Sequence, residues 1–473
     1  MSGHTLMHTA ASTAASTGAP KPAHPPERFA LRGDLLDFTA EPALDDPACP
    51  SVRWRPAHWV LVEHGRIAAV QPNDPPEGWP RIDHAGCLVL PGFIDTHVHS
   101  AQLDVIGAWG TQLLDWLHTH TFPAEQRMAD PAHAARMSGT FLDALLAVGT
   151  TSACVFPTVH AVSLDALFEE ASVRGMRLVA GKVLMDRHAP AALCDAADPA
   201  VAERVCRAQI ERWHGQGRLA YAVTPRFAPT SSEAQLALAG RLLASAPGLY
   251  LQTHVAENVQ EVQWVRELFP EARSYLDVYA RHGLLGPRSI FAHGIWLDDE
   301  DRVRLAAAGS QVAFCPSSNL FLGSGLFDWR AAREAGVAVS VASDVGGGTS
   351  LSMRRTLLAA YQVQAGLQRR VTAWALLHAA TRGAAQALQL GHEIGSLEPG
   401  THADFCVWQT ATHPLAQRRQ AVARDLHDQL FAWMTLGDNS ANNLHDEQQA
   451  LAAYRQVLAI TGTNHGWQPL STT

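Results

Sequence analysis

Lysine is almost missing from this sequence of 473 residues. Only Lys21 and Lys182 are present, so arginine supplies 34 of the 36 basic residues, a skew typical of coding bias. Asp and Glu together number 45, which gives a formal net charge of -9. Because phosphate binding requires clustered cations, this balance argues against nucleic acid as a partner.

Long apolar runs and paired cysteine motifs are missing as well. No stretch reaches the roughly 18 consecutive apolar residues of a membrane-spanning helix, so we expect no membrane partner. The seven cysteines include no Cys-X-X-Cys pair, which favours reduced thiols in a cytoplasmic protein. Residues 1–28 are rich in Ala, Ser, Thr and Pro and lack the pattern of a secretory signal, so we expect a disordered arm there.

Short apolar runs recur eight times between residues 87 and 345, mostly separated by amphipathic stretches of helix length. Strands that alternate with helices indicate parallel βαβ units, and eight such units close into a (β/α)8 barrel. The runs span residues 87–99, 151–159, 177–186, 219–227, 249–257, 289–296, 311–319 and 337–345.

The segments on either side of the barrel have a different pattern of apolar and turn-forming residues. Residues 29–90 and 390–435 alternate short apolar runs with turn signals, which predicts one small β-sandwich domain built from both segments. The barrel would then occupy residues 91–389, with two helices near its end at about 350–366 and 372–389. Residues 436–473 would form a C-terminal extension with helical patterning.

Ionisable residues stand where several of the barrel runs end. His97 and His99 lie two apart in a strand and therefore face the same side. His254, His293 and Asp344 lie at the ends of the fifth, sixth and eighth runs. Because the carboxyl ends of barrel strands carry the active site, we expect these side chains to converge.

This set of side chains predicts a metal site. Three imidazole nitrogens and one carboxylate suit zinc, and the best set is His97, His99, His254 and Asp344. His293 is either a further ligand or a group that holds the attacking water. Because zinc lowers the pKa of a bound water to about 7, the pattern favours a hydrolase.

Glu257 follows His254 by three residues in the segment THVAENVQE. At the end of a strand, its carboxylate would lie above the metal and act as a general acid and base. The alternative is a solvated acid that opens the next helix, where the helix dipole favours negative charge.

Longer segments resemble a known family. PGFIDTHVH, HVAE, His293 and ASDV resemble the metal-dependent amidohydrolase superfamily, and GRIAAV and GSLEPGTHADFCVW resemble its discontinuous β-sandwich. Within that superfamily, residues 91–130, with LLDWL and the HTFPAE block, are similar to the guanine deaminase family. GKVLMDRHAP, TPRFAPT, CPSSNLFLGSGLF and SDVGGGTS extend this similarity. The resemblance implies hydrolysis of guanine to xanthine and ammonia in purine catabolism.

The resemblance also implies a role for each matching residue. Glu257 would move the proton, while His293 and Asp344 would steady the water; His254, Glu257 and Asp344 would also border the substrate. Gln102, Arg226 and Phe227 would hold the purine through their donors, acceptors and aromatic face. Alternatively, Arg226 makes an ordinary salt bridge at the barrel rim and Phe227 belongs to the core.

Cofactor number and assembly follow from the same likeness. The fourth run, LAYAVTPRF, lacks the modified lysine that bridges two metals in some superfamily members, which favours one zinc per chain. The family also implies a homodimer. Two other functions stay open: a deaminase of a related aminopurine, aminopyrimidine or triazine, and a non-catalytic scaffold that keeps the barrel.

Overall fold

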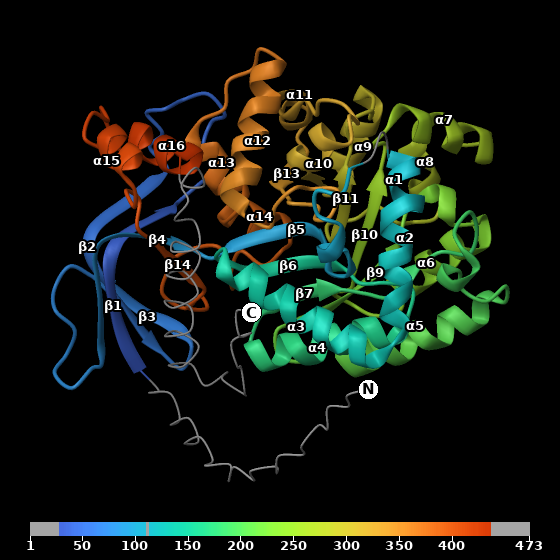
Figure 1. Ribbon diagram of the computed structural model, residues 1–473, viewed down its shortest axis with the longest axis horizontal. Coiled ribbons are helices and arrows are strands. Elements are labelled where there is room, and N and C mark those ends of the chain that lie inside the picture. Colours follow the sequence, from blue (N-terminus) through green and yellow to red (C-terminus); the bar gives the residue numbers. More distant parts are fainter. Residues whose placement is uncertain (1–27, 110–112, 437–473) are drawn as a thin grey trace, which may run out of the picture.

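The computed structural model describes residues 28–109 and 113–436 (Figure 1). The arm expected at residues 1–28 and the extension expected at 436–473 lie outside this range, apart from Arg28 and Leu436. Arg28 begins the first strand, and Leu436 ends the last helix. No helix in the described ranges is long and apolar enough to cross a membrane.

A parallel barrel forms the centre of the fold, as predicted. Its strands neighbour one another in chain order from β5 to β13, and β7 and the short β8 together fill the third position. The strands are β5 (Phe93–His99), β6 (Thr150–Phe156), β7 (Arg177–Ala180), β8 (Val183–Leu184), β9 (Leu219–Pro225), β10 (Tyr250–Val255), β11 (Ser289–His293), β12 (Gln311–Phe314) and β13 (Ala338–Val341).

The segment after β13 connects the last strand of the barrel to the first. The backbone N–H of Asp344 donates to the carbonyl of His97 at 2.9 Å, and the N–H of His99 donates to the carbonyl of Val345 at 2.9 Å. These two bonds lie at the carboxyl end of β5. The backbone that nearly closes the barrel therefore also places Asp344 beside the first two histidines.

Helices surround the barrel (Figure 1), and several begin with a cap that the sequence encodes. The side chain of Asp130 accepts from the N–H of Ala132 at the start of α3, and Asp198 accepts from Ala200 at the start of α5. Each cap precedes a proline in the first turn, where the missing N–H costs nothing.

Both short and long helices follow the first five barrel strands. In chain order they are η1 (Ser100–Val105), α1 (Leu113–Trp116), η2 (Leu117–Thr121), α2 (Phe122–Gln126), η3 (Arg127–Ala129), α3 (Pro131–Ala147), α4 (Ala161–Arg174), η4 (Ala191–Leu193), α5 (Pro199–Trp213), η5 (Ala228–Thr230), α6 (Glu233–Leu243), α7 (Val259–Leu268) and α8 (Tyr275–Ala280).

The remaining helices follow β11 to β14. They are α9 (Asp299–Ala308), α10 (Pro316–Phe321), α11 (Trp329–Glu334), α12 (Met353–Gly366), α13 (Ala373–Ala379), α14 (Arg382–Ala387), α15 (Pro414–Gln420) and α16 (Leu426–Leu436). The single helix expected at 372–389 is divided into α13 and α14, because Thr381 adopts a non-helical backbone (φ -134°, ψ -103°).

Segments from both ends of the chain form the small domain. Among the described residues it is one five-stranded sheet in the order β14-β4-β1-β2-β3, on the left of Figure 1. Its strands are β1 (Arg28–Phe38), β2 (Val52–Glu63), β3 (Arg66–Gln71), β4 (Arg81–Pro91) and β14 (Phe405–Trp408).

The apolar run at 87–99 is shared between the two sheets. Its first part ends β4, and its second part is β5 of the barrel. Gly92 separates them where the chain passes the barrel wall, and a Cβ atom there would lie only 2.1 Å from Oγ1 of Thr151. The sequence pattern therefore predicts one strand over 87–99, whereas the structure divides this run between β4 of the small domain and β5 of the barrel.

Asp37 joins the two halves of the small domain. Its carboxylate is fully buried and accepts from Nε of Arg53 at 2.8 Å and from the backbone N–H of Leu397 at 2.8 Å. Because Leu397 belongs to the returning C-terminal segment, this one carboxylate connects the first strands to the last part of the domain.

We expect Asp37→Asn to lower the free energy of unfolding by about 2 kcal/mol, because the half-buried cation of Arg53 and the buried N–H of Leu397 lose their charged acceptor. Urea denaturation measures this difference. Asp83→Asn is the control, since Asp83 pairs with Arg32 on the exposed surface at 3.6 Å and should change stability by less than about 1 kcal/mol. Equal effects of the two substitutions would contradict the assignment.

Candidate active site

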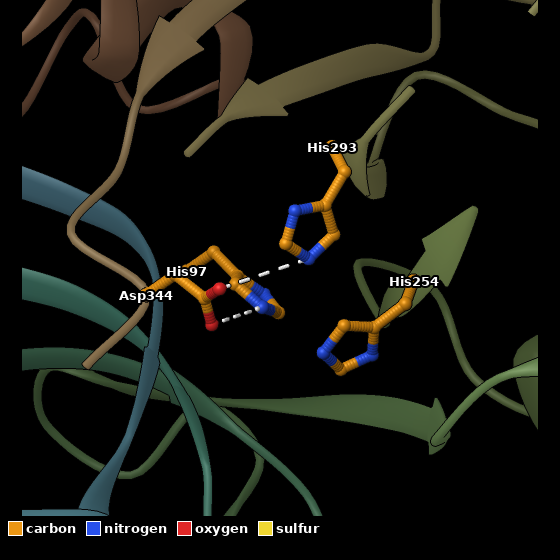
Figure 2. Close-up of side chains that lie close together, drawn as sticks. All are labelled: His97, His254, His293 and Asp344. Atoms are coloured by element: carbon orange, nitrogen blue, oxygen red, sulfur yellow. Dashed lines mark ion pairs between the residues drawn. The ribbon is translucent and has the colours of Figure 1, made fainter. Parts of the chain in front are cut away.

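The carboxyl ends of four barrel positions bring the predicted histidines and the aspartate together. His97 and His99 end β5, His254 lies in β10 and His293 is the last residue of β11. Asp344 lies just beyond β13. Figure 2 shows four of these side chains pointing toward one another: His97, His254, His293 and Asp344. Their potential ligand atoms all lie within 4.8 Å of one another.

The carboxylate of Asp344 faces three of the imidazoles. Its Oδ1 lies 3.2 Å from Nε2 of His97 and 3.2 Å from Nε2 of His99. Its Oδ2 lies 3.8 Å from Nε2 of His293. Burial raises the pKa of Asp344, but the hydrogen bonds with His97 and His99 outweigh burial and hold the pKa well below its ordinary value.

The compact group differs in one member from the ligand set expected from the sequence. It contains His293, which the sequence left as either a ligand or a water-holding group, and it does not contain His99. His99 stacks on His254, with ring centroids 5.3 Å apart. Its contact with the carboxylate of the group is the 3.2 Å approach of Nε2 to Oδ1 of Asp344. The structure thus gathers all five side chains, with His99 at the edge of the compact four.

The chemistry of these side chains fits a metal ion. Apart from facing Asp344, the buried Nε2 atoms of His97 and His293 make no hydrogen bond within the described residues. Burial lowers the pKa of His97 to about 4 and that of His254 well below its ordinary value, so both rings are neutral and offer lone pairs. Neutral imidazoles beside a carboxylate are the donors that zinc prefers.

Other groups orient two of the rings. Nδ1 of His254 lies 2.7 Å from the backbone oxygen of Arg226, and Nδ1 of His293 lies 2.9 Å from Oδ1 of Asn319. Such bonds orient a metal-binding imidazole and direct its other nitrogen into the site. The sequence did not identify Asn319, although it lies within the CPSSN segment.

Glu257 is buried beside His293 and does not open the next helix as a solvated residue. Its Oε2 lies 3.4 Å from Nε2 of His293, and its Oε1 accepts from Oγ of Ser324 at 3.1 Å. The capping of α7 is done by Asn258 and Glu261, which form a capping box. Burial raises the pKa of Glu257 to about 7, an effect that the charge of His293 only partly offsets. A carboxyl group with this pKa can both take and give a proton near neutral pH.

His293 experiences opposing effects on its pKa. Burial lowers the pKa, but the carboxylates of Glu257 and Asp344 raise it, and the net result is a pKa above the ordinary value. The ring therefore has a more basic character than His97 or His254 on the same rim.

A pocket opens directly over this group. The three residues expected to hold a purine all line it, and each is almost completely buried: Gln102, Arg226 and Phe227. Apolar side chains complete the wall: Leu113, Trp116, Leu117 and Leu322. The pocket thus combines an apolar slot for a flat ring with a few polar groups.

Arg226, directly after β9 at the carboxyl end of the barrel, makes a salt bridge as the alternative interpretation expected, and this salt bridge is buried. Nη1 of Arg226 donates to both carboxylate oxygens of Glu125 at 2.8 Å. Glu125, on α2, has no exposed surface and also accepts from Nε2 of Gln102 at 2.9 Å. The sequence did not single out Glu125, and the only signal for it was a charged residue in the HTFPAE block.

Three further residues have structural roles. Cys315 is fully buried, and burial raises the pKa of its thiol well above the ordinary value, which excludes a thiolate nucleophile. Lys182 pairs with Asp195, away from the metal group. Gly348 follows the site loop in a tight turn, since a Cβ there would lie 1.8 Å from the backbone oxygen of Ser343.

Comparisons with known proteins agree with this geometry. Residues 88–439 match the model of the amidohydrolase family. The chain is 43% identical to the guanine deaminase of Escherichia coli (strain K12) over 417 residues, which cover 87% of this chain and 94% of the relative. The solved structure of E. coli guanine deaminase superposes with a TM-score of 0.83 at 42% identity and covers 87% of this chain and 96% of that one. A guanine deaminase from C. acetobutylicum with bound guanine superposes with a TM-score of 0.78 at 26% identity, covering 87% and 96%.

Two His-X-His pairs allow a direct test of the metal assignment. We expect the double variant His97→Ala, His99→Ala to lose most of its bound divalent metal, because it removes one ligand of the compact group and the neighbour that also faces Asp344. The matched control is His118→Ala, His120→Ala, which alters a pair on the helical segment η2 and should keep the metal content of the wild type. Inductively coupled plasma mass spectrometry measures metal per chain, and equal metal loss in both variants would contradict the site.

Proposed function

Because the chain belongs to the amidohydrolase family, and within it to the guanine deaminases, we propose that it hydrolyses guanine to xanthine and ammonia. The observation that carries this conclusion is the position of the purine pocket. The polar residues that border this one cavity are Gln102, Arg226, Glu257, His99, His254, His293 and Asp344. A flat ring held by the polar pair would lie over the groups that move protons.

We assign one zinc ion per chain to the compact group, where His97, His254, His293 and Asp344 would hold it. His99 is a fifth candidate ligand, because its Nε2 lies 3.2 Å from Oδ1 of Asp344. The support is the set of neutral, buried imidazole nitrogens facing a carboxylate of low pKa. When bound, zinc supplies a nucleophile at neutral pH by lowering the pKa of a coordinated water to about 7.

Glu257 carries the protons of the reaction. Its carboxylate accepts a proton from the attacking water and delivers it to the ring nitrogen beside C2 of guanine. The carboxylate then takes the remaining proton from the hydroxyl at C2 and gives it to the departing amino group, so that ammonia leaves and the C2 carbonyl of xanthine forms. The pKa of about 7 suits both directions of transfer. Ser324 supports this role, because its hydroxyl holds Oε1 while Oε2 faces the site.

His293 and Asp344 orient the attacking water beside Glu257. Nε2 of His293 lies between the carboxylates of Glu257 and Asp344, 3.4 Å from the first and 3.8 Å from the second, so the ring fixes the position of the water relative to both. The carboxylate of Asp344 stays ionised and accepts a hydrogen bond from the water. Pre-placed partners of this kind cost no reorganisation when charge develops.

Arg226, Gln102 and Phe227 hold the purine over these groups. Arg226 offers fixed donors to the exocyclic oxygen of guanine, and Gln102 offers an amide to the ring edge. Phe227 contributes an apolar aromatic wall and packs against Trp264, with ring centroids 6.4 Å apart.

We further place the enzyme in the cytoplasm, as a homodimer acting in purine catabolism. Seven free cysteines support a reducing compartment. Trp109, Trp296 and Leu320 are exposed apolar side chains of the kind that subunit contacts cover. Light scattering of the purified chain measures the assembly directly.

A substrate panel distinguishes this function from its alternatives. We expect ammonia release from guanine with a kcat/KM at least about 100-fold above that for adenine, cytosine or an aminotriazine. The donors of Arg226 and the amide of Gln102 would pair with guanine, and they would lack matching partners when one of the other compounds is bound. A coupled ammonia assay, with xanthine followed by absorbance, measures this. Comparable rates for guanine and the others would contradict the substrate, and no turnover with metal bound would point to the scaffold.

Glu257→Ala tests the proton transfer. We expect kcat to fall by about 10² to 10⁴-fold while the metal content and the melting temperature stay near those of the wild type. Steady-state kinetics on guanine provides the measurement. The control is Glu267→Ala, since Glu267 is an exposed residue of α7 that contacts Gln263, and it should retain full activity. A Glu257→Ala variant with normal kcat would remove Glu257 from the mechanism.

A further inference from the structure

Glu125 is a completely buried carboxylate that connects two polar walls of the pocket. It lies on the short helix α2, and its two partners come from η1 and from the end of β9. No role in proton transfer or metal binding falls to it in the proposed reaction. A buried charge is costly unless it is paired, so its partners are informative.

The contact with Arg226 uses only one end of the guanidinium group. Nη1 donates to Oε1 and Oε2 of Glu125, both at 2.8 Å, and the guanidinium carbon lies 5.6 Å from the ring centroid of Phe122. Phe122 and Glu125 lie three residues apart on α2 and so hold Arg226 from two sides. Within the described residues, the side-chain hydrogen bonds of Arg226 are all made by Nη1, which leaves the donors on Nε and Nη2 for a ligand in the pocket.

The contact with Gln102 determines which way its amide points. Nε2 of Gln102 donates to Oε1 of Glu125 at 2.9 Å, while the backbone N–H of Gly346 donates to Oε1 of Gln102 at 3.0 Å. Because an ionised carboxylate can only accept and a backbone N–H can only donate, the opposite amide orientation would lose both bonds. This close approach requires glycine at position 346, since a Cβ there would lie 2.7 Å from the backbone oxygen of Gln102.

We propose that Glu125 is a positioning residue that sets the hydrogen-bond pattern of the pocket. It occupies Nη1 of Arg226, so that Nε and Nη2 remain as donors, and it orients the amide of Gln102, whose Oε1 keeps a second lone pair as an acceptor. This inference rests on the proposed function. A 6-oxopurine with a ring N–H at position 1 offers the complementary acceptor and donor. A 6-aminopurine reverses both, with an amino donor and a ring-nitrogen acceptor. Glu125 thereby selects the 6-oxo ring without touching it.

The test compares deamination at C2 of guanine with that of 2,6-diaminopurine, which differs at position 6. In Glu125→Gln, the new amide can either accept from Nε2 or donate to Oε1 of Gln102, so it no longer fixes the orientation of that amide, and Arg226 loses its counter-charge. We expect kcat/KM for guanine to fall by about 100-fold, mainly through KM, and the preference for guanine over 2,6-diaminopurine to narrow by at least about tenfold. A merely structural defect would lower both activities equally and leave the preference unchanged.

Glu125→Asp is a second variant for the case that Glu125→Gln does not fold. It keeps the buried charge, but its side chain is one methylene too short to reach both Arg226 and Gln102. We expect it to fold, with a wild-type metal content, and to narrow the preference in the same direction. Glu267→Gln, at an exposed position on α7, is the matched control and should keep the wild-type preference.

The outcomes separate the two proposals. An unchanged preference in folded Glu125→Gln or Glu125→Asp, or the loss of folding in both, would overturn the positioning role. Failure of the wild-type protein to release ammonia from guanine would overturn the proposed function itself.

Discussion

The contact between the carboxylate of Asp344 and the histidines of the first barrel strand holds the site together. The backbone of Asp344 bonds to His97, and its side chain faces both His97 and His99. The same residue thus helps to close the barrel and provides the negative charge of the metal group. This explains why the site lies at the seam between the last strand and the first.

Burial gives the site its chemical character. Out of water, two imidazoles become neutral ligands, and the Glu257 carboxyl acquires a pKa of about 7. Asp344 experiences the same burial and stays ionised, because hydrogen bonds with histidines outweigh it. Two carboxyl groups on one rim therefore differ in pKa, as the proton transfer proposed for Glu257 and the metal binding proposed for Asp344 require.

A second buried carboxylate organises the substrate side of the pocket. Glu125 has no water contact, and its hydrogen bonds go to Arg226 and Gln102. A carboxylate cannot donate, so it imposes one orientation on the amide beside it. Two buried carboxyl groups thus belong to the site, Glu257 with its proposed role in proton transfer and Glu125 with its proposed role in orienting the substrate-binding side chains.

The sequence predicts the metal side of the site better than the substrate side. His97 and His99 are recognisable from strand periodicity alone, and His254 and His293 stand where apolar runs end. The barrel follows from the same alternation of runs. Glu125 was missed because its partner Arg226 lies 101 residues away and only the folded chain brings them together.

Two boundaries also escaped sequence reasoning. The run at 87–99 passes from one sheet to the other at Gly92, which hydrophobic pattern cannot show because both parts are apolar. The break between α13 and α14 at Thr381 depends on a local backbone conformation that no proline or glycine at that position announces. In both cases the apolar pattern is continuous, so the position of the break is visible only in the folded backbone.

The most direct test of the central claim is anomalous diffraction at the zinc absorption edge from crystals of the active protein. We expect one strong peak per chain, within bonding distance of His97, His254, His293 and Asp344. An active protein with no peak at that position, or with its zinc at His118 and His120 instead, would contradict it.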